Sequence, residues 1–270
     1  MTEGTVSDMT IADADADRAL LAEAVREAGA IAMRYFGNRP KAWDKHPNDP
    51  VSEADLAVND SLKARLLAAR PDYGWLSEEN EDDGTRLKTR RVWIVDPIDG
   101  TRAFLQAKPE FAVSVALVEA GAPLLGAVYN PATEEFFDAV AGRGAALNGA
   151  AIFASERKSF AGGRFLASPR TITRYGWREM APGAEFAEVF SIAYRLARVA
   201  AGMADAAISL AAKNDWDIAA ADLIVREAGG LCTTEDGGGF RFNGATPRHP
   251  SVVASGPRLH GKILDMLRAA

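Results

Sequence analysis

The sequence predicts an α+β fold, in which helices and an antiparallel sheet share one core. Two observations support this class. Across residues 15–36 and 53–70, apolar residues recur at the three-to-four-residue spacing of an amphipathic helix. From Phe111 to Asn148, short apolar runs alternate with turn residues, the pattern of consecutive antiparallel strands. Elements of both kinds in one chain favour layers of helix packed on sheet.

In the first half, a helix is predicted over residues 15–36 and ends at Gly37. A loop with three prolines, residues 38–51, leads to Ser52, which suits the N-cap of a second helix over residues 53–70. Pro71 stops that helix. Short strands are expected over residues 73–76 and 92–95, and each runs into acidic residues.

The rest of the chain continues the alternation. The strands between residues 111 and 148 are separated by turns at 121–123, 130–131 and 142–144. Residues 155–186 show one recognisable strand, at 164–168. A helix over 194–203, a strand over 206–210 and a helix over 216–228 follow, and a last helix begins at Pro257.

Composition limits the function. The chain has 270 residues, of which 48% are hydrophobic and 25% charged, as in an ordinary globular protein. Its formal charge of -6 argues against general nucleic-acid binding. Cys232 is the only cysteine, so no internal disulfide is possible, and we expect it to be a buried strand residue. The polar start, MTEGTVSDMTIADADAD, and the interrupted apolar stretch at 111–129 predict neither a signal peptide nor a membrane span, hence a cytoplasmic location.

Acidic residues gather where predicted strands or turns end. They stand at Glu78-Glu79, at Asp96-Pro-Ile-Asp99 and at Asp215-Trp-Asp217. Taken alone, the glutamate pair suits a solvated surface and Asp217 suits a helix cap. Asp96 and Asp99 instead follow the apolar run Trp-Ile-Val, which reads as a strand buried on both faces.

Two carboxylates held close repel each other unless a proton or a cation lies between them. A cluster of carboxylates with a free peptide carbonyl favours Mg²⁺ over Zn²⁺. The histidines His46, His249 and His260 are not spaced as a zinc pair. Haloacid dehalogenase-type hydrolases also end a strand in two aspartates, but with one intervening residue; here Pro97 and Ile98 intervene, which disfavours that class.

Three blocks in this order, Glu78-Glu79, DPIDGT at 96–101 and WDIAAADLIVREAGG at 216–230, resemble the inositol monophosphatase superfamily. The likeness begins at SEAD, residues 52–55. The resemblance implies an α/β/α/β/α sandwich and Mg²⁺-dependent, Li⁺-sensitive hydrolysis of a small phosphomonoester. We expect one compact unit of two halves: residues 1–150 with most metal ligands, and 151–270 with Asp217 and substrate contacts. A homodimer is also consistent with the resemblance.

The resemblance also implies roles for individual residues. One Mg²⁺ ion is held by Glu78, Asp96 and the carbonyl of Ile98, and a second by Asp96, Asp99 and Asp217, with a third ion optional. Glu79 lies beside them. Asp55 and Thr101 orient the attacking water, so the catalytic set is Asp55, Glu78, Asp99 and Thr101. The phosphate is received by Asp99, Gly100 and Thr101, with Arg102 next to them. Water attacks in line, without a phosphoenzyme.

The substrate is less defined by these blocks. The superfamily acts on inositol phosphates, 3′(2′),5′-bisphosphate nucleotides, fructose 1,6-bisphosphate and histidinol phosphate. Animal-type inositol monophosphatases carry a glutamate seven positions before the last metal aspartate, where this chain has Leu210, which accepts no hydrogen bond from a hydroxyl. The segment DGTRAFLQAKPEFAVSVAL looks closer to bacterial bisphosphate nucleotidases and some histidinol-phosphate phosphatases.

We therefore predict 3′-phosphoadenosine 5′-phosphate as the substrate, with inositol 1-phosphate and histidinol phosphate as alternatives. Arg102, Arg195 and Lys213 either meet a second phosphate or are ordinary surface charges. A different class also stays open, a regulatory protein-interaction factor with residual phosphatase activity, because some relatives bind transcription or ribosome-assembly machinery. The complete set of carboxylates argues against a scaffold without activity.

Overall fold

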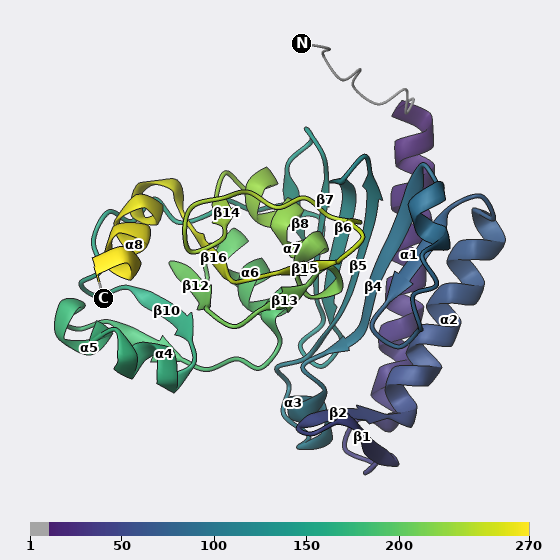
Figure 1. Ribbon diagram of the computed structural model, residues 1–270, viewed down its shortest axis with the longest axis horizontal. Coiled ribbons are helices and arrows are strands. Elements are labelled where there is room, and N and C mark those ends of the chain that lie inside the picture. Colours follow the sequence, from purple (N-terminus) through teal and green to yellow (C-terminus); the bar gives the residue numbers. More distant parts are fainter. Residues whose placement is uncertain (1–10, 270) are drawn as a thin grey trace.

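The computed structural model describes residues 11–269, which form five stacked layers (Figure 1). A pair of long helices covers one face of a seven-stranded sheet, and a second pair of helices separates that sheet from a five-stranded one. Shorter helices cover the outer face of the five-stranded sheet. The predicted α+β class and its α/β/α/β/α layering are confirmed.

The seven-stranded sheet is built from residues 74–151. Its outer helices are α1 (Ile11–Tyr35) and α2 (Glu53–Ala69). Both faces are apolar: on β4, Trp93 and Val95 pack toward α1 and α2, whereas Val92 and Ile94 belong to the core between the sheets. In sheet order the strands are β3 (Gly74–Ser77), β4 (Arg91–Asp99), β5 (Ala112–Glu119), β6 (Ala122–Asn130), β7 (Glu135–Val140), β8 (Ala145–Leu147) and β9 (Ala150–Ala151), antiparallel except for β3 beside β4.

The five-stranded sheet is built from strands between residues 164 and 255. The helices between the sheets are α6 (Ile192–Ala200) and α7 (Asp215–Glu227). A glycine lets α7 approach the first sheet closely, because a Cβ at Gly126 would lie 2.7 Å from the carbonyl oxygen of Ala220. In sheet order the strands are β11 (Glu185–Ala187), β10 (Arg164–Ala167), β12 (Ala206–Ser209), β16 (Val252–Ser255) and β14 (Leu231–Thr233), covered outside by α4 (Pro169–Arg174), α5 (Trp177–Met180) and α8 (Pro257–Ala269).

Strand β4 runs further than the sequence indicated. A strand ending at Val95 was expected, since proline lacks the N–H that a central strand needs. In the structure, Asp96 still pairs with Ser114, and Asp99 pairs with Ala112 after a shift in register. The register shift lies between Asp96 and Asp99, so Pro97 needs no partner in the sheet. The same shift places two aspartates at the end of β4, three positions apart.

Several short elements were not predicted. The proline-containing loop folds into a hairpin, the segment after Gly100 is a short helix, and the segment 155–186 holds α4, α5 and β11 beside its one predicted strand. Elements this short depend on tertiary contacts rather than on their own periodicity. They include β1 (Ala42–His46), β2 (Asp49–Ser52), the 3₁₀ helix η1 (Thr85–Lys88), α3 (Thr101–Leu105), and β13 (Lys213–Asn214) paired with β15 (Arg248–His249).

Two smaller expectations concern Cys232 and the membrane. Cys232 is buried in β14 with a free thiol, as predicted. Within residues 11–269, no helix combines the length and the apolar character that crossing a membrane requires. The start of the polar stretch that argued against a signal peptide, residues 1–10, lies outside the described residues.

Candidate metal and phosphate site

Three aspartates that are far apart in the sequence meet at one edge of the first sheet. Asp96, Asp99 and Asp217 each offer a carboxylate oxygen, and these oxygens all lie within 4.8 Å of one another. Asp96 and Asp99 come from the carboxyl end of β4, where they are 1% and 7% exposed, and Asp217 comes from the first turn of α7. The predicted meeting of the second and third acidic blocks is therefore present.

Asp217 serves the helix as well as the cluster. It is the third residue of α7, and its Oδ2 accepts a hydrogen bond of 2.6 Å from the backbone N–H of the N-cap residue Asn214. This is one half of a capping box, which fixes the side chain at the helix start. The capping interpretation and the cluster interpretation are compatible, because a carboxylate has a second oxygen.

Asp99 is held by the start of α6. Its Oδ2 accepts 2.6 Å hydrogen bonds from the hydroxyl of Ser191 and from the backbone N–H of Ala193. Ser191 also caps α6 by accepting from the N–H of Tyr194. Sequence reasoning missed these two partners, since more than ninety residues separate them from Asp99 and a serine N-cap was the only local signal.

The cluster is electrostatically unfavourable as it stands. Burial raises the pKa of Asp96 well above its usual range, and neighbouring acids raise it further. Burial also raises the pKa of Asp99 to about 6, and burial with the nearby charge of Asp99 raises that of Asp217 to about 7. In addition, Oδ1 of Asp96 is buried without a hydrogen-bond partner. A buried carboxylate oxygen without a donor is costly, so this donor set fits a hard divalent cation such as Mg²⁺.

The glutamate pair is tied to the hairpin of β1 and β2. Lys45 on β1 donates to Oε1 of Glu78 at 2.8 Å and to Oε1 of Glu79 at 2.9 Å. Only 5% of the Glu79 side chain is exposed, so a solvated-surface interpretation is wrong for that residue. Burial raises the pKa of Glu79 to about 7 despite the hydrogen bond from Lys45. Glu78 lies outside the three-aspartate group but lines the same pocket.

Asp55 and Thr101 are brought together as predicted. The Thr101 hydroxyl lies 3.1 Å from Oδ1 of Asp55 and 3.0 Å from the carbonyl oxygen of Ile98. Asp55 is 1% exposed, and its Oδ2 accepts from both the backbone N–H and the hydroxyl of Ser52. Asp55 is thus the acid of the α2 capping box, and it presents its remaining oxygen to Thr101.

A pocket of about 290 Å³ contains most of the predicted site. Gly100 adopts φ +95°, and a Cβ there would lie 2.9 Å from the carbonyl oxygen of Glu110, so glycine is required at this turn. Arg102 donates to the carbonyl of Asn48, which ties α3 to the hairpin. The predicted residues that line the pocket are Glu78, Asp96, Ile98, Asp99, Gly100, Thr101, Arg102 and Asp217.

Arg195 and Lys213 are not ordinary surface charges. Lys213 is half-buried and lines the same pocket, where its charge lowers the pKa of Asp217 against the larger effect of burial. Arg195 is half-buried on α6, and its charge acts on Asp99. Both cations therefore belong to the surroundings of the carboxylates.

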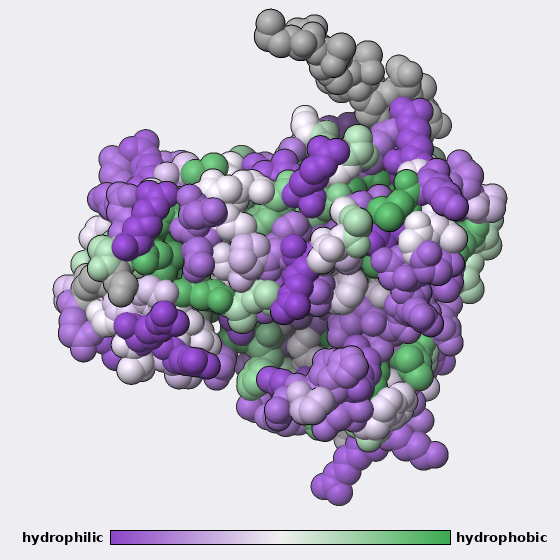
Figure 2. Space-filling model, in the orientation of Figure 1, coloured by the Kyte–Doolittle hydropathy of each residue, from purple (hydrophilic) through white to green (hydrophobic). Residues whose placement is uncertain are grey.

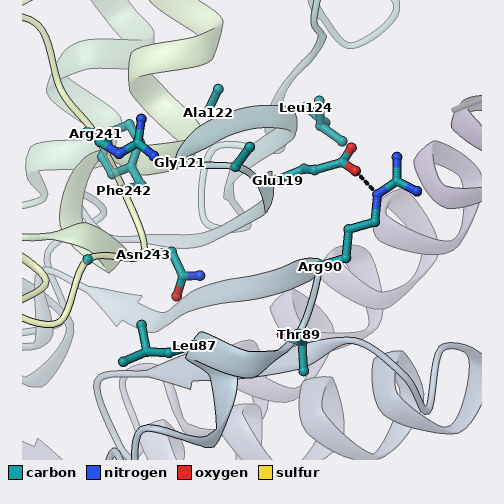
Figure 3. Close-up of a pocket in the computed structure, with 12 residues that line it drawn as sticks. Leu87, Thr89, Arg90, Glu119, Gly121, Ala122, Leu124, Arg241, Phe242 and Asn243 are labelled. Atoms are coloured by element: carbon teal, nitrogen blue, oxygen red, sulfur yellow. Dashed lines mark hydrogen bonds and ion pairs between the residues drawn. The ribbon is translucent and has the colours of Figure 1, made fainter. Parts of the chain in front are cut away.

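A larger cavity, of about 720 Å³, lies at the other end of the sheet. Figure 3 shows Arg90 and Arg241 on separate parts of its rim, with Glu119 bonded to Arg90. Glu119 pairs with Arg91 at the start of β4, whereas Asp96 and Asp99 stand at the end of that strand. Its lining includes a single carboxylate, so this cavity lacks the donor set for a metal-dependent reaction.

Comparison with known proteins agrees with this geometry. The inositol-1-monophosphatase of Rhizobium meliloti is 37% identical over 240 residues, covering 82% of this chain and 86% of that protein. The histidinol-phosphatase of Mycobacterium tuberculosis is 34% identical over 284 residues, covering 97% and 98%. The crystal structure of extragenic suppressor protein suhB from Bartonella henselae superposes with a TM-score of 0.82 at 30% identity, covering 94% and 98%. Because the model of the inositol monophosphatase family matches residues 13–270, this chain belongs to that family.

Proposed function

We propose that the chain hydrolyses a small phosphomonoester with Mg²⁺ as its cofactor. The observation that carries this proposal is the meeting of Asp96, Asp99 and Asp217, whose oxygens lie within 4.8 Å of one another and include a buried oxygen without a donor. Family membership supports the same reaction class.

The proposed ligands fall into two sets. Glu78, Asp96 and the carbonyl of Ile98 would hold one ion, and Asp96, Asp99 and Asp217 a second. Bound ions of this kind neutralise the phosphate, lower the pKa of a water and stabilise the leaving oxygen.

The chain's own groups supply positioning and proton transfer. Asp55 is a buried carboxylate already bonded to the Thr101 hydroxyl, so the pair can orient a water and pass its proton to Asp55. Burial raises the pKa of Asp55, which makes it a better proton acceptor than an exposed aspartate. The backbone at Asp99, Gly100 and Thr101 lines the same pocket and is proposed to contact the phosphate.

For the substrate we propose 3′-phosphoadenosine 5′-phosphate. Leu210 lies beside Tyr175 and several arginines in a neighbouring pocket that no carboxylate lines. Inositol hydroxyl groups need hydrogen-bond acceptors, and the cationic histidinol half would be repelled by arginine. The relatives named inositol-1-monophosphatase and histidinol-phosphatase keep inositol 1-phosphate and histidinol phosphate as the competing candidates.

The test is phosphate release from these three substrates and fructose 1,6-bisphosphate in Mg²⁺, with and without Li⁺, using Asp99→Asn as the blank. We expect the highest kcat/KM for 3′-phosphoadenosine 5′-phosphate and inhibition by Li⁺. Preference for inositol 1-phosphate or histidinol phosphate would keep the metal chemistry and refute the nucleotide. Absence of release from the whole panel would refute the proposed function and favour a regulatory interaction factor.

A further inference from the structure

A second pocket, of about 350 Å³, is lined by three arginines and by no acidic side chain. Arg170 and Arg174 come from α4, and Arg195 comes from α6. Tyr175 and Leu210 give it an apolar wall. We call it the arginine pocket. In a chain with a formal charge of -6, three cations gathered without a carboxylate require an explanation.

The arginine pocket adjoins the carboxylate cluster. Leu210 and Ala211 line the arginine pocket, and Lys213, two residues further along, lines the pocket of the cluster. Two residues of extended chain span about 7 Å. Arg195 stands two residues after Ala193, whose N–H binds Asp99, and its charge acts on Asp99. Figure 2 shows that the surface is hollowed between the lobe formed by α4 and α5 and the hairpin of β1 and β2.

Among the described residues, two of the three arginines have no acidic partner, whereas Arg195 faces the charges of Asp99 and Glu188. Arg170 and Arg174 are four residues apart on one helix, so they share a face, and like charges at this spacing destabilise a helix. Both are exposed, and neither forms an ion pair with a described side chain; the guanidinium of Arg174 lies over the ring of Tyr175. Arg195 is half-buried and donates its Nε–H to the carbonyl of Val189, a neutral acceptor.

We propose that the arginine pocket binds a second phosphate, carried by the alcohol half of the substrate, while the cluster of aspartates handles the phosphate that is cleaved. Planar guanidinium groups suit this role because they bind phosphate oxygens in pairs. The wall of Tyr175 and Leu210 suits an apolar planar group between the two phosphates. The proposal rests on the proposed function and makes Arg170, Arg174 and Arg195 specificity-determining residues of the same reaction.

The experiment compares two nucleotides that differ only in the second phosphate. Adenosine 3′,5′-bisphosphate, which is 3′-phosphoadenosine 5′-phosphate, is set against adenosine 3′-monophosphate, and the readout is the ratio of their kcat/KM values. Wild type should favour the bisphosphate. In Arg170→Ala and Arg174→Ala, that ratio should fall by about tenfold each, as for loss of a charge-assisted hydrogen bond.

A matched control is Arg178→Ala on α5, an exposed arginine that lies over the ring of Phe186 and outside the arginine pocket. It should leave the ratio unchanged. Arg195→Lys keeps the positive charge but removes the planar guanidinium group with its paired N–H donors. This variant should lower the ratio through a change in KM rather than in kcat. An unchanged ratio in Arg170→Ala, Arg174→Ala and Arg195→Lys would overturn the proposal.

A binding measurement separates this inference from the proposed function. Equilibrium binding of both nucleotides is measured in Ca²⁺, by calorimetry, for wild type and the double variant Arg170→Ala/Arg174→Ala. If wild type releases no phosphate from either nucleotide in Mg²⁺, the proposed nucleotide substrate fails, and the ratio of the two Kd values still decides the inference. A bisphosphate preference that disappears in the double variant supports the arginine pocket, and equal affinities in wild type refute it.

Discussion

The hydroxyl of Thr101 lies 3.1 Å from Oδ1 of Asp55 and joins the first residue of α3 to the first turn of α2. The other oxygen of Asp55 is occupied by Ser52, which fixes the carboxylate through the capping box. Two helix starts that are 46 residues apart thus hold a polar pair in place at the edge of the pocket. The pair is built by local capping before any substrate binds.

Thr101→Val should separate this role from folding. Valine keeps the shape of threonine and removes the hydroxyl, so the fold should persist while kcat falls by roughly 10²–10⁴, the usual worth of acid–base assistance. Thr101→Ser restores a hydroxyl at the same position and should recover most of the activity. The measurement is kcat of wild type and both variants, from steady-state phosphate release at saturating Mg²⁺. A valine variant with nearly normal kcat would exclude Thr101 from the reaction.

Asp99→Asn should abolish turnover without unfolding the chain. An amide oxygen can still accept the hydrogen bonds of Ser191 and Ala193, so circular dichroism and Tm should stay close to wild type. The lost charge removes several kcal/mol of support for a cation and its substrate, or about 10³-fold in rate. Asp222→Asn is the matched control, because Asp222 is a buried acid of α7 outside the cluster. If both variants lost turnover to a similar degree, the effect of Asp99→Asn would reflect loss of a buried aspartate in general and not loss of a cluster carboxylate.

The elements that could be predicted from sequence are those with strong periodicity. The α2 helix begins after Ser52 as expected, and the meander of β5 to β8 follows the predicted turns. The hairpin of β1 and β2 escaped prediction, since most of its residues are partly or fully exposed and it carries prolines. Periodicity reports burial on a regular face, and short elements held by distant partners have little of it. The proposed boundary between halves at residue 150 stays a prediction.

The candidate site also has a part that could be predicted from the sequence and a part that could not. Its acids were recognisable because two aspartates at the end of an apolar strand make little sense without a cation. The partners that hold them were not: Ser191 reaches Asp99 across 92 positions, and Lys45 reaches Glu78 across 33. The sequence left open whether Arg195 meets a second phosphate or is a surface charge, because nothing in its local sequence indicates that α6 places it beside the cluster. Contacts between distant segments depend on the layering, which a local pattern does not encode.

The acids also predict how stability depends on pH in metal-free protein. The folded pKa of Asp217 is about 7 and that of Asp99 about 6, both above the value of roughly 3.9 in an unfolded chain. The folded state therefore binds more protons than the unfolded state between these values, and the free energy of unfolding falls as pH rises. His260, with a pKa lowered to about 4 by burial, acts in the opposite direction below its unfolded pKa of about 6.5.

The window from about pH 6.5 to pH 8 consequently isolates the acids. In chelator, Tm should fall across this window, and Asp217→Asn should make the slope smaller, with Glu79, whose pKa is also raised to about 7, supplying the remainder. Added Mg²⁺ should raise Tm more at pH 8 than at pH 6.5, because protons compete for the same carboxylate oxygens. Differential scanning fluorimetry at both pH values checks this. A Tm in chelator that rises with pH across the window would contradict the electrostatics described for the cluster.

Gly126→Ala tests how closely α7 must approach the first sheet. The new Cβ would lie 2.7 Å from the carbonyl oxygen of Ala220, a backbone atom that cannot move without the helix. Overpacking of this kind costs about 1–3 kcal/mol, or a fall in Tm of roughly 2–12 °C. Because Asp217 stands on the first turn of the same helix, the displacement should also weaken Mg²⁺ binding.

The control for that variant is Gly261→Ala in α8, where nothing lies within 4 Å of the new Cβ. There alanine should stabilise the helix by about 0.5–1 kcal/mol, since it only removes the flexibility of glycine. Thermal unfolding and Mg²⁺ titration of both variants provide the comparison. A Gly126→Ala protein that matches wild type in both measurements would show that the position of Asp217 does not depend on the contact between β6 and α7.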